Sequence, residues 1–256
     1  MSDDAPGAGL TRDAFLGGRL QILQPRGGYR AGVDPVLLAA SVPARAGQSV
    51  LDLGCGTGVA ALCLGARVPG LDLSGLELQP EYAELARRNA ADNGIPLQVH
   101  EGDLRAMPAA LRARQFDHVI ANPPYFDRSC GSPSHDTGRD TALGGSTPMA
   151  DWMAAAARRT APKGYVTMIQ RAERLPELLS AAQETLGSLQ ALPLVPRRGR
   201  AARLVLLRGR RGGRAAFRLH DGWVLHRGAA HESDGDDYTR AAARVLRLGK
   251  ALPFPV

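Results

Sequence analysis

The stretch that decides the fold reads Leu51-Asp52-Leu53-Gly54-Cys55-Gly56-Thr57-Gly58. Its first residues, together with Ser49 and Val50, form a short apolar run that is typical of a buried strand. The alanine- and leucine-rich residues 57–68 predict a helix, so the glycines occupy the turn between strand and helix. A glycine-rich turn lets a ligand approach the unpaired backbone N–H groups of a helix start. We therefore expect this turn to bind a cofactor.

Strand-like and helix-like segments alternate after this turn. We expect strands at 71–78, 97–100, 116–121 and 165–170 and helices at 80–93, 148–160 and 175–186. This alternation predicts an α/β fold with a doubly wound, mostly parallel sheet and helices on both faces. Further expected elements are a turn at 162–164, a hairpin of 189–195 and 203–208, weak strands at 217–219 and 223–226, and a helix at 238–248.

Composition indicates an ordinary globular protein. The chain has 256 residues, 44% of them hydrophobic and 22% charged, which fits one large domain. No segment resembles a linker, so we expect one domain over residues 11–256, preceded by a flexible tail at 1–10. The sequence contains no apolar run of about 18 residues and no secretory signal, which argues against a membrane partner.

The cysteines argue against a disulfide framework. The chain has an odd number of cysteines, Cys55, Cys63 and Cys130, and no two of them are spaced as a CxxC pair. We therefore expect neither disulfides nor a metal site, and a reducing, cytoplasmic location. At Cys55 we expect a small side chain filling the tight turn of the cofactor loop.

Positive charge is concentrated in the last quarter of the chain. Residues 191–256 contain 14 Lys and Arg against 5 Asp and Glu, whereas residues 1–190 contain 18 against 20. Arginine makes up 30 of the 32 basic residues. A GC-rich coding bias explains why arginine is used in place of lysine. It does not explain why residues 197–214 contain no acidic residue. We predict a polyanion-binding face within 197–214, with contacts from Arg197, Arg198, Arg200, Arg210 and Arg211.

Two acidic residues follow predicted strands next to the cofactor loop. Glu77 comes 21 residues after Gly56, where a carboxylate can accept hydrogen bonds from both ribose hydroxyls of a nucleoside. Asp103 follows the third strand and can accept the amino protons of an adenine ring. Val59 stands where the dinucleotide fingerprint GxGxxG requires its last glycine. The sequence thus disfavours an NAD-dependent oxidoreductase.

The tetrapeptide Asn122-Pro123-Pro124-Tyr125 follows another strand, at the edge where doubly wound sheets bind ligands. The Asn122 side-chain oxygen and the Pro123 carbonyl can accept the two protons of a planar amino group. Its lone pair then becomes available for attack on an electrophilic carbon. The prolines stiffen the turn, and Tyr125 offers a flat face for a base removed from its stack.

These motifs resemble those of the class I S-adenosylmethionine-dependent methyltransferases. The resemblance rests on residues 51–58, Leu76-Glu77-Leu78 and Gly102-Asp103-Leu104, and it spans roughly residues 30–210. It implies a Rossmann-like seven-stranded sheet with a reversed last strand, S-adenosylmethionine as cofactor, and Asp52, Gly54, Cys55, Gly56, Gly58, Glu77, Asp103 and Asn122 at the cofactor. The tetrapeptide resembles the (D/N/S)PP(Y/F/W) signature of amino-group methyltransferases.

The signature alone does not choose among acceptors, which include DNA or RNA adenine and protein glutamine. Residues 15–20 and 24–40 resemble the entry segment of bacterial tRNA(Val) adenine-N(6) methyltransferases. That family modifies the adenine 3′ of the anticodon in a valine tRNA. The resemblance implies that Gly32 and Asp34 lie at the cofactor and that the arginines contact the anticodon arm of tRNA. Asp34 is also suited to cap a helix that starts at Pro35.

Three alternatives stay open: a protein glutamine N(5)-methyltransferase, an rRNA base-amino methyltransferase and a catalytically inactive RNA-binding module. Residues 126–147 form a long polar stretch that is typical of a functional or disordered loop. Its His135 is expected to be solvated rather than to act as a base. Packing is the expected role of Trp152, Trp223 and His226. The sequence does not predict an oligomeric state.

Overall fold

A computed structural model describes residues 9–125, 147–228 and 237–255. Cys130, His135 and nearly all of the expected loop 126–147 therefore lie outside the described residues. Within those ranges, no helix combines the length and apolar character needed to cross a membrane.

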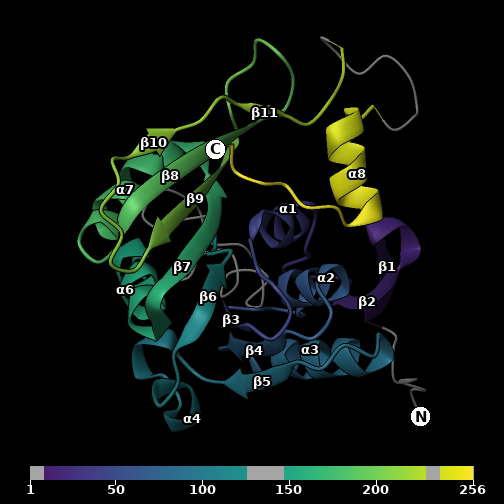
Figure 1. Cartoon of the computed structure of the whole chain (residues 1–256). Coiled ribbons are helices and arrows are strands. Elements are labelled where there is room, and N and C mark those ends of the chain that lie inside the picture. The colour runs from purple at the N-terminus through teal and green to yellow at the C-terminus, as the bar shows by residue number, and fades with distance from the viewer. Residues whose placement is uncertain (1–8, 126–146, 229–236, 256) are drawn as a thin grey trace, which may run out of the picture.

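The centre of the fold is a mostly parallel sheet (Figure 1). Its seven long strands lie in the order β8-β9-β7-β6-β3-β4-β5, and only β9 runs antiparallel to its neighbours. This arrangement confirms the predicted seven-stranded sheet with a reversed last strand. The bounds are β3 Ser49–Leu53, β4 Asp72–Glu77, β5 Gln98–Glu101, β6 Phe116–Ala121, β7 Thr160–Arg171, β8 Gly187–Val195 and β9 Leu204–Arg210.

Two very short strands extend this sheet to nine. Both β10 (Arg218–Leu219) and β11 (Trp223–Val224) pair with β8 in parallel. The turn expected at 162–164 does not precede the strand, because β7 already begins at Thr160 and continues through these residues. A register shift opposite β6 and a positive φ of 67° at Lys163 accommodate the expected turn as an irregularity within the strand.

Helices cover both faces of the sheet and enclose two apolar cores (Figure 1). Neighbouring residues of β6 belong to opposite cores, Ile120 to the first and Val119 to the second, as the strand period requires. The first face carries α1 (Asp34–Ser41), α2 (Val59–Arg67) and α3 (Pro80–Asp92), and the second carries α4 (Ala109–Arg112), α6 (Met149–Arg159) and α7 (Leu175–Gln183). The last helix, α8 (Arg240–Leu248), packs near α1.

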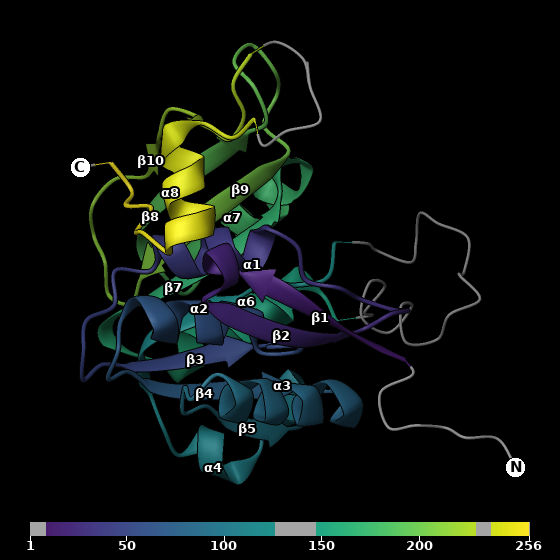
Figure 2. The ribbon, with the colours of Figure 1, turned by 90° about the vertical axis from the view of Figure 1, so that its right-hand side faces the viewer.

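An antiparallel hairpin of β1 (Leu10–Phe15) and β2 (Leu20–Pro25) was not predicted. Asn89 of α3 and Asn93, at the C-cap of that helix, hold it, because their amides exchange hydrogen bonds of 2.8–3.1 Å with the backbone of Leu23 and Gln21. Figure 2 shows the hairpin beside α2 and α3. The hairpin directs residues 26–33 toward the carboxyl edge of the sheet. β1 begins at Leu10, the last residue of the expected tail, and residues 1–8 lie outside the described residues.

Candidate active site

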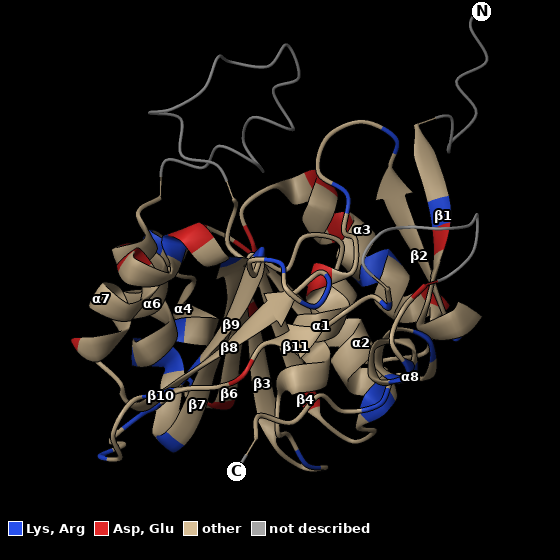
Figure 3. Ribbon diagram, turned by 90° about the horizontal axis from the view of Figure 1, so that it is seen from above, with Lys and Arg blue, Asp and Glu red and all other residues tan. Residues whose placement is uncertain are grey.

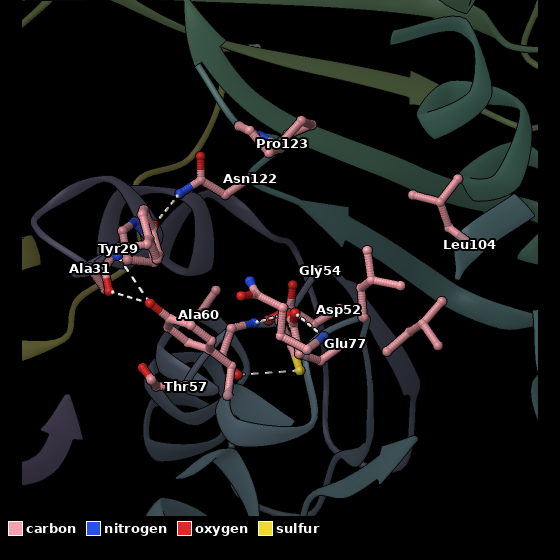
Figure 4. Close-up of a pocket in the computed structure, with 18 of the residues that line it drawn as sticks. Tyr29, Ala31, Asp52, Gly54, Thr57, Ala60, Glu77, Leu104, Asn122 and Pro123 are labelled. Carbon is pink, nitrogen blue, oxygen red and sulfur yellow. Dashed lines mark hydrogen bonds between the residues drawn. The ribbon is translucent and has the colours of Figure 1, made fainter. Parts of the chain in front are cut away.

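A pocket opens at the carboxyl ends of β3, β4 and β6 (Figure 4). The cofactor loop after β3 and the tetrapeptide after β6 line this one pocket, as the sequence predicted from two separate motifs. Its further walls come from the segment before α1, from α3 and from α6. Predicted site residues in the lining are Asp52, Gly54, Cys55, Gly56, Glu77, Asp103, Asn122, Pro123, Pro124 and Tyr125.

The cofactor loop is fixed by backbone contacts to β4. The N–H groups of Gly54 and Cys55 both donate to the carbonyl of Leu76, at 2.8 and 3.0 Å. Gly54 adopts a φ of +65°, and a Cβ atom there would lie 2.6 Å from the Trp152 ring. Only glycine fits both the conformation and the space. Cys55 is buried and packs against Gly75, in agreement with the predicted packing role.

Asp52 supports the cofactor loop by holding the helix that follows it. Its Oδ2 atom accepts a hydrogen bond of 3.2 Å from the N–H of Ala61 in α2. Burial raises the pKa of Asp52 to about 8, and the nearby Glu77 charge acts in the same direction. The carboxyl group is therefore protonated over much of the neutral range, which limits the cost of burying it. The role of Asp52 in this structure is to anchor the first turn of α2.

Glu77 lies at the end of β4 with its carboxylate already oriented. Oε2 accepts from the N–H of Gly56 at 2.8 Å, and Oε1 accepts from the N–H of Gln79 at 3.0 Å. Burial raises the pKa of Glu77 despite these bonds. Each carboxylate oxygen has a second lone pair, so the side chain keeps acceptor capacity toward a ribose.

Asp103 also lines the pocket, but its carboxylate has a protein partner. Arg105 holds it in an ion pair at 2.7 Å, and hydrogen bonds from Arg105 lower the pKa of Asp103. The group is thus a carboxylate acceptor at neutral pH. Its predicted contact with an adenine ring stays a prediction.

Asn122 presents an acceptor without a partner. Its Nδ2 donates to the hydroxyl of Tyr29 at 3.3 Å, whereas its Oδ1 is buried and has no hydrogen-bond partner among the described residues. Leaving a buried acceptor unpaired costs about 1–3 kcal/mol. An unpaired oxygen in a pocket is a place where a ligand N–H can bind, and this supports the role predicted for Asn122.

The two proline carbonyls are held from the end of β7. Fully buried Gln170 donates from Nε2 to the carbonyls of Pro123 and Pro124, both at 3.3 Å. Arg174 donates to the Pro124 carbonyl as well, at 3.3 Å. The Pro123 carbonyl therefore already accepts one hydrogen bond and retains one lone pair for a second. Sequence patterns gave no signal for Gln170, because it lies within an apolar strand.

Tyr125 is tied to Asp34 of α1. The Tyr125 hydroxyl donates to Oδ2 of Asp34 at 2.5 Å, and the Arg171 guanidinium lies 5.8 Å from the ring centroid. Burial, followed by the Asp34 charge, raises the pKa of Tyr125. The expected helix cap at Asp34 is wrong: Asp34 is the first residue of α1, Val33 occupies the cap position, and no side chain caps this end.

Some predicted site residues do not line the pocket, and some residues that line it were not predicted. Gly32, Asp34 and Gly58 are not part of the lining, although Asp34 reaches the site through Tyr125. The unpredicted lining includes Tyr29, which accepts a hydrogen bond from Asn122, and Tyr82 of α3, whose hydroxyl accepts from the Tyr29 N–H. Trp152 packs in the second core as expected and also forms part of the wall. The only sequence signal for Tyr29 was an aromatic residue in a glycine-rich segment.

The basic segment is divided in space, because β9 separates its two ends. Residues 196–203 lie at the pocket edge, where the carbonyl of Arg203 accepts from the N–H of Ala172 at 2.9 Å. Arg210 and Arg211 lie at the opposite edge, where Arg210 pairs with Tyr165 in β7. The seven residues of β9 separate these two edges by about 20 Å. Figure 3 shows basic segments at both ends of the strands.

Arg197 differs from its neighbours because it has an acidic partner. Its guanidinium pairs with Asp237 and donates to the carbonyl of Arg227, and its side chain is only 14% exposed. Residues 197–214 contain no acid, but Asp237 reaches Arg197 from outside the segment. His226 also contacts Asp237, at 2.5 Å, and stacks on Tyr238, so it packs in this cluster as predicted. Arg198 and Arg200 are exposed.

Comparisons with known proteins agree with this geometry. A family model described as methyltransferase small domain matches residues 31–134. A Porphyromonas gingivalis protein named tRNA1(Val) (adenine(37)-N6)-methyltransferase is 32% identical over 182 residues, which cover 66% of this chain and 69% of that protein. A protein of the same name from Yersinia enterocolitica is 36% identical over 140 residues, and the match spans about half of each chain, 53%.

Two solved structures have the same fold. A predicted O-methyltransferase from Agrobacterium tumefaciens superposes with a TM-score of 0.71 at 25% identity, covering 87% of this chain and 100% of that one. A 16S rRNA N2 methyltransferase from Thermus thermophilus, solved in complex with AdoMet and guanosine, gives a TM-score of 0.54 at 18% identity. This match covers 79% of the present chain and 50% of the other, and it supports the fold alone.

Proposed function

The chain belongs to the tRNA1(Val) (adenine(37)-N6)-methyltransferase family, and from that premise we propose that it methylates the exocyclic amino group of an adenine in tRNA. S-adenosylmethionine is the methyl donor. The name of its relatives supports the finer proposal that the target is adenine 37 of a valine tRNA, beside the anticodon. A cytoplasmic site of action, expected from the cysteine content, is part of the same proposal.

The observation that carries the proposal is the buried Oδ1 of Asn122, which is unpaired within the part of the chain that the structure describes. The amino nitrogen of adenine is a weak nucleophile, because its lone pair is delocalised into the ring. Oδ1 accepts one amino proton, and the free lone pair of the Pro123 carbonyl accepts the other. These fixed dipoles favour a pyramidal nitrogen and stabilise the positive charge that develops on it.

The residues on the other side of the pocket fit the donor. The N–H groups at the start of α2 and the carboxylate of Glu77 suit the nucleoside part, and Asp103 suits the adenine amino group. When bound, S-adenosylmethionine supplies a methyl group on a positively charged sulfur. The walls from Trp152 and Leu104 are apolar and buried, and they would exclude water from the acceptor.

Exposed arginines at the pocket edge are the proposed contacts for tRNA phosphates. Arg198, Arg200 and Arg203 follow β8 at the edge that also carries the tetrapeptide. Arg197 is left out because it pairs with Asp237. Arg210 and Arg211 lie at the far edge of the sheet and are assigned no contact with the RNA segment that enters the pocket. Such phosphate contacts position the RNA but do not read its sequence.

Methyl transfer to tRNA is tested directly with labelled donor. The purified protein is incubated with radiolabelled S-adenosylmethionine and either tRNA from cells lacking this protein or a release factor. We expect label in tRNA, and mass spectrometry of the digested RNA should identify N6-methyladenosine. Label in the release factor alone would replace this proposal with glutamine methylation. Absence of label from both would contradict the proposed function.

The location of the RNA contact is tested by charge removal at the two edges. Replacing Arg198 and Arg200 by glutamine should reduce the slope of log K against log salt by about one for each lost phosphate contact, and by less for single strands. Arg112 and Arg214, which are exposed at the opposite edge, give the matched control pair. Equal effects of the two pairs would show that the pocket edge has no special role.

A further inference from the structure

Gln170 is a fully buried polar residue near the end of β7 that contacts the acceptor tetrapeptide. Its Nε2 atom donates to the carbonyls of Pro123 and Pro124, both at 3.3 Å. Its Oε1 atom accepts from the N–H of Arg171 at 2.8 Å. Both amide hydrogens and the amide oxygen therefore have partners, and these bonds join the tetrapeptide to the strand.

The orientation of the Gln170 amide follows from the chemistry of its partners. A backbone N–H only donates a hydrogen bond, and a backbone carbonyl only accepts one. Turning the amide over would place Oε1 against two carbonyl oxygens and Nε2 against the N–H of Arg171. All three hydrogen bonds would then be lost, so Nε2 faces the prolines.

The proline rings alone do not fix the direction of the Pro123 carbonyl. A proline ring fixes φ, whereas the direction of the carbonyl depends on ψ. The following Pro124 keeps ψ of Pro123 in the extended region, which still spans about 40°. The hydrogen bond from Gln170 narrows that range. The Pro124 carbonyl also accepts from Arg174, at 3.3 Å, so the loss of Gln170 would act mainly on Pro123.

We propose that Gln170 is a positioning residue that sets the direction of the Pro123 carbonyl and so places its second lone pair for the substrate amino group. The inference rests on the proposed function, in which that carbonyl and Oδ1 of Asn122 accept the two amino protons. Asn122 and Pro123 both line the pocket (Figure 4). Gln170 is not among the described residues of the lining, so it acts through Pro123.

The first test is Gln170→Met, which keeps a similar size and shape but donates no hydrogen bond. The kcat for tRNA methylation should fall roughly 3- to 10-fold. The KM for tRNA and the affinity for S-adenosylmethionine should stay near wild-type values, because the lost interaction acts in the transition state. An unchanged kcat would overturn the inference.

Thr167→Val is the matched control for Gln170→Met. It also replaces a buried polar side chain of β7 by an apolar one of similar shape. This variant should retain the wild-type kcat, whatever its melting temperature. Equal losses of kcat in the two variants would show that Gln170 contributes only to the packing of the strand, and the inference would be withdrawn.

The Pro123 carbonyl can be observed separately, because residues 123 and 124 are the only adjacent prolines in the sequence. In protein labelled with ¹³C,¹⁵N-proline, the Pro123 carbonyl carbon and the Pro124 nitrogen therefore form the only peptide bond between labelled atoms. Their single NMR correlation reports on this carbonyl. Loss of the hydrogen bond should move its carbon resonance upfield in Gln170→Met and leave it in place in Thr167→Val.

Gln170→Glu provides a second variant of the same shape, which decides the question if Gln170→Met does not fold. It keeps an oxygen for the N–H of Arg171, but it carries at most one proton, so it holds at most one of the two proline carbonyls. In every variant kcat should fall where the Pro123 resonance moves and stay at the wild-type value where it does not. A change in one without the other would overturn the inference.

The proposed function and this inference fail in different ways. No methylation of tRNA by the wild type removes both together. If the wild type methylates tRNA but kcat does not follow the Pro123 carbonyl resonance, the inference alone is removed.

Discussion

The two halves of the pocket are built in different ways. The cofactor half consists of the contiguous residues 52–58 and the adjacent ends of β4 and α2, and its contacts are mainly backbone hydrogen bonds. The acceptor half is a tetrapeptide held by side chains that are distant in sequence. Tyr29 and Asp34 lie 93 and 91 residues before their partners, and Gln170 lies 47 residues after Pro123.

This difference has a functional consequence. Backbone contacts and glycine conformations keep the cofactor half in place whatever binds in the other half. In the acceptor half, orientation depends on a few hydrogen bonds between side chains. Changes there should therefore affect the methylation rate, whereas changes in the cofactor half should affect cofactor affinity and stability.

The largest expected effect lies in the acceptor half, at Asn122. Asn122→Ala removes Oδ1, which is the only buried acceptor without a hydrogen-bond partner among the described pocket residues. We expect kcat to fall by about 10²–10³, the usual cost of losing one preorganised dipole in a transition state. Calorimetry should find nearly wild-type affinity for S-adenosylmethionine. A variant that methylates normally would contradict the mechanism, and one that loses both properties would contradict the separation of the two halves.

The next effect is expected in the cofactor half, at Gly54. Gly54→Ala places a Cβ atom 2.6 Å from the Trp152 ring and keeps a positive φ, so the loop has to move. We expect cofactor affinity to fall about 10-fold or more, together with a lower melting temperature.

Gly47→Ala provides the matched control for Gly54. Gly47 has a φ of +84°, but no atom lies within 4 Å of an added Cβ. This variant should show only the backbone strain of about 1–2 kcal/mol and unchanged cofactor affinity. Equal affinities in the two variants would mean that contact with Trp152 does not shape the loop.

The difference between the two halves of the pocket also explains which parts of the site the sequence predicted. The strand 49–53 and the glycine turn follow from local patterns, and the structure places both as predicted. The tetrapeptide was predicted as a motif, but its partners were not. A glutamine inside an apolar strand and a tyrosine in a glycine-rich segment gain their roles only when the fold brings the segment after β2 to the carboxyl ends of β6 and β7.

Two errors have the same physical origin. Asp34 precedes Pro35, which is a common pattern at a helix start, yet its carboxylate bonds Tyr125 instead of capping α1. A tertiary hydrogen bond outweighed the local preference. The eight arginines of residues 197–214 are close in sequence, but β9 separates those before it from those at and after its end, at opposite edges of the sheet. Charge patterns in sequence predict a polyanion surface only after the strand direction is known.

The smallest effect concerns Asp52, a buried carboxyl group in the cofactor half that accepts from the N–H of Ala61 at the start of α2. Burial raises the pKa of Asp52 to about 8, whereas an unfolded aspartate titrates near 3.9. Between about pH 4 and pH 8 the folded state holds a proton that the unfolded state has lost. The free energy of unfolding should therefore fall as pH rises through this window and level off above pH 8.

Asp52→Asn tests this, because it cannot ionise and keeps an oxygen for the N–H of Ala61. The variant should gain stability over the wild type as pH rises from 4 to 8, by at least about 1 kcal/mol at pH 8, or a few degrees in Tm. Exposed Glu81→Gln is the matched control and should show no such trend. Parallel stability curves for Asp52→Asn and the wild type would show that Asp52 is ionised in the folded protein. The cofactor half would then contain a charged side chain held by the N–H of Ala61, and it would no longer differ from the acceptor half in resting mainly on backbone contacts.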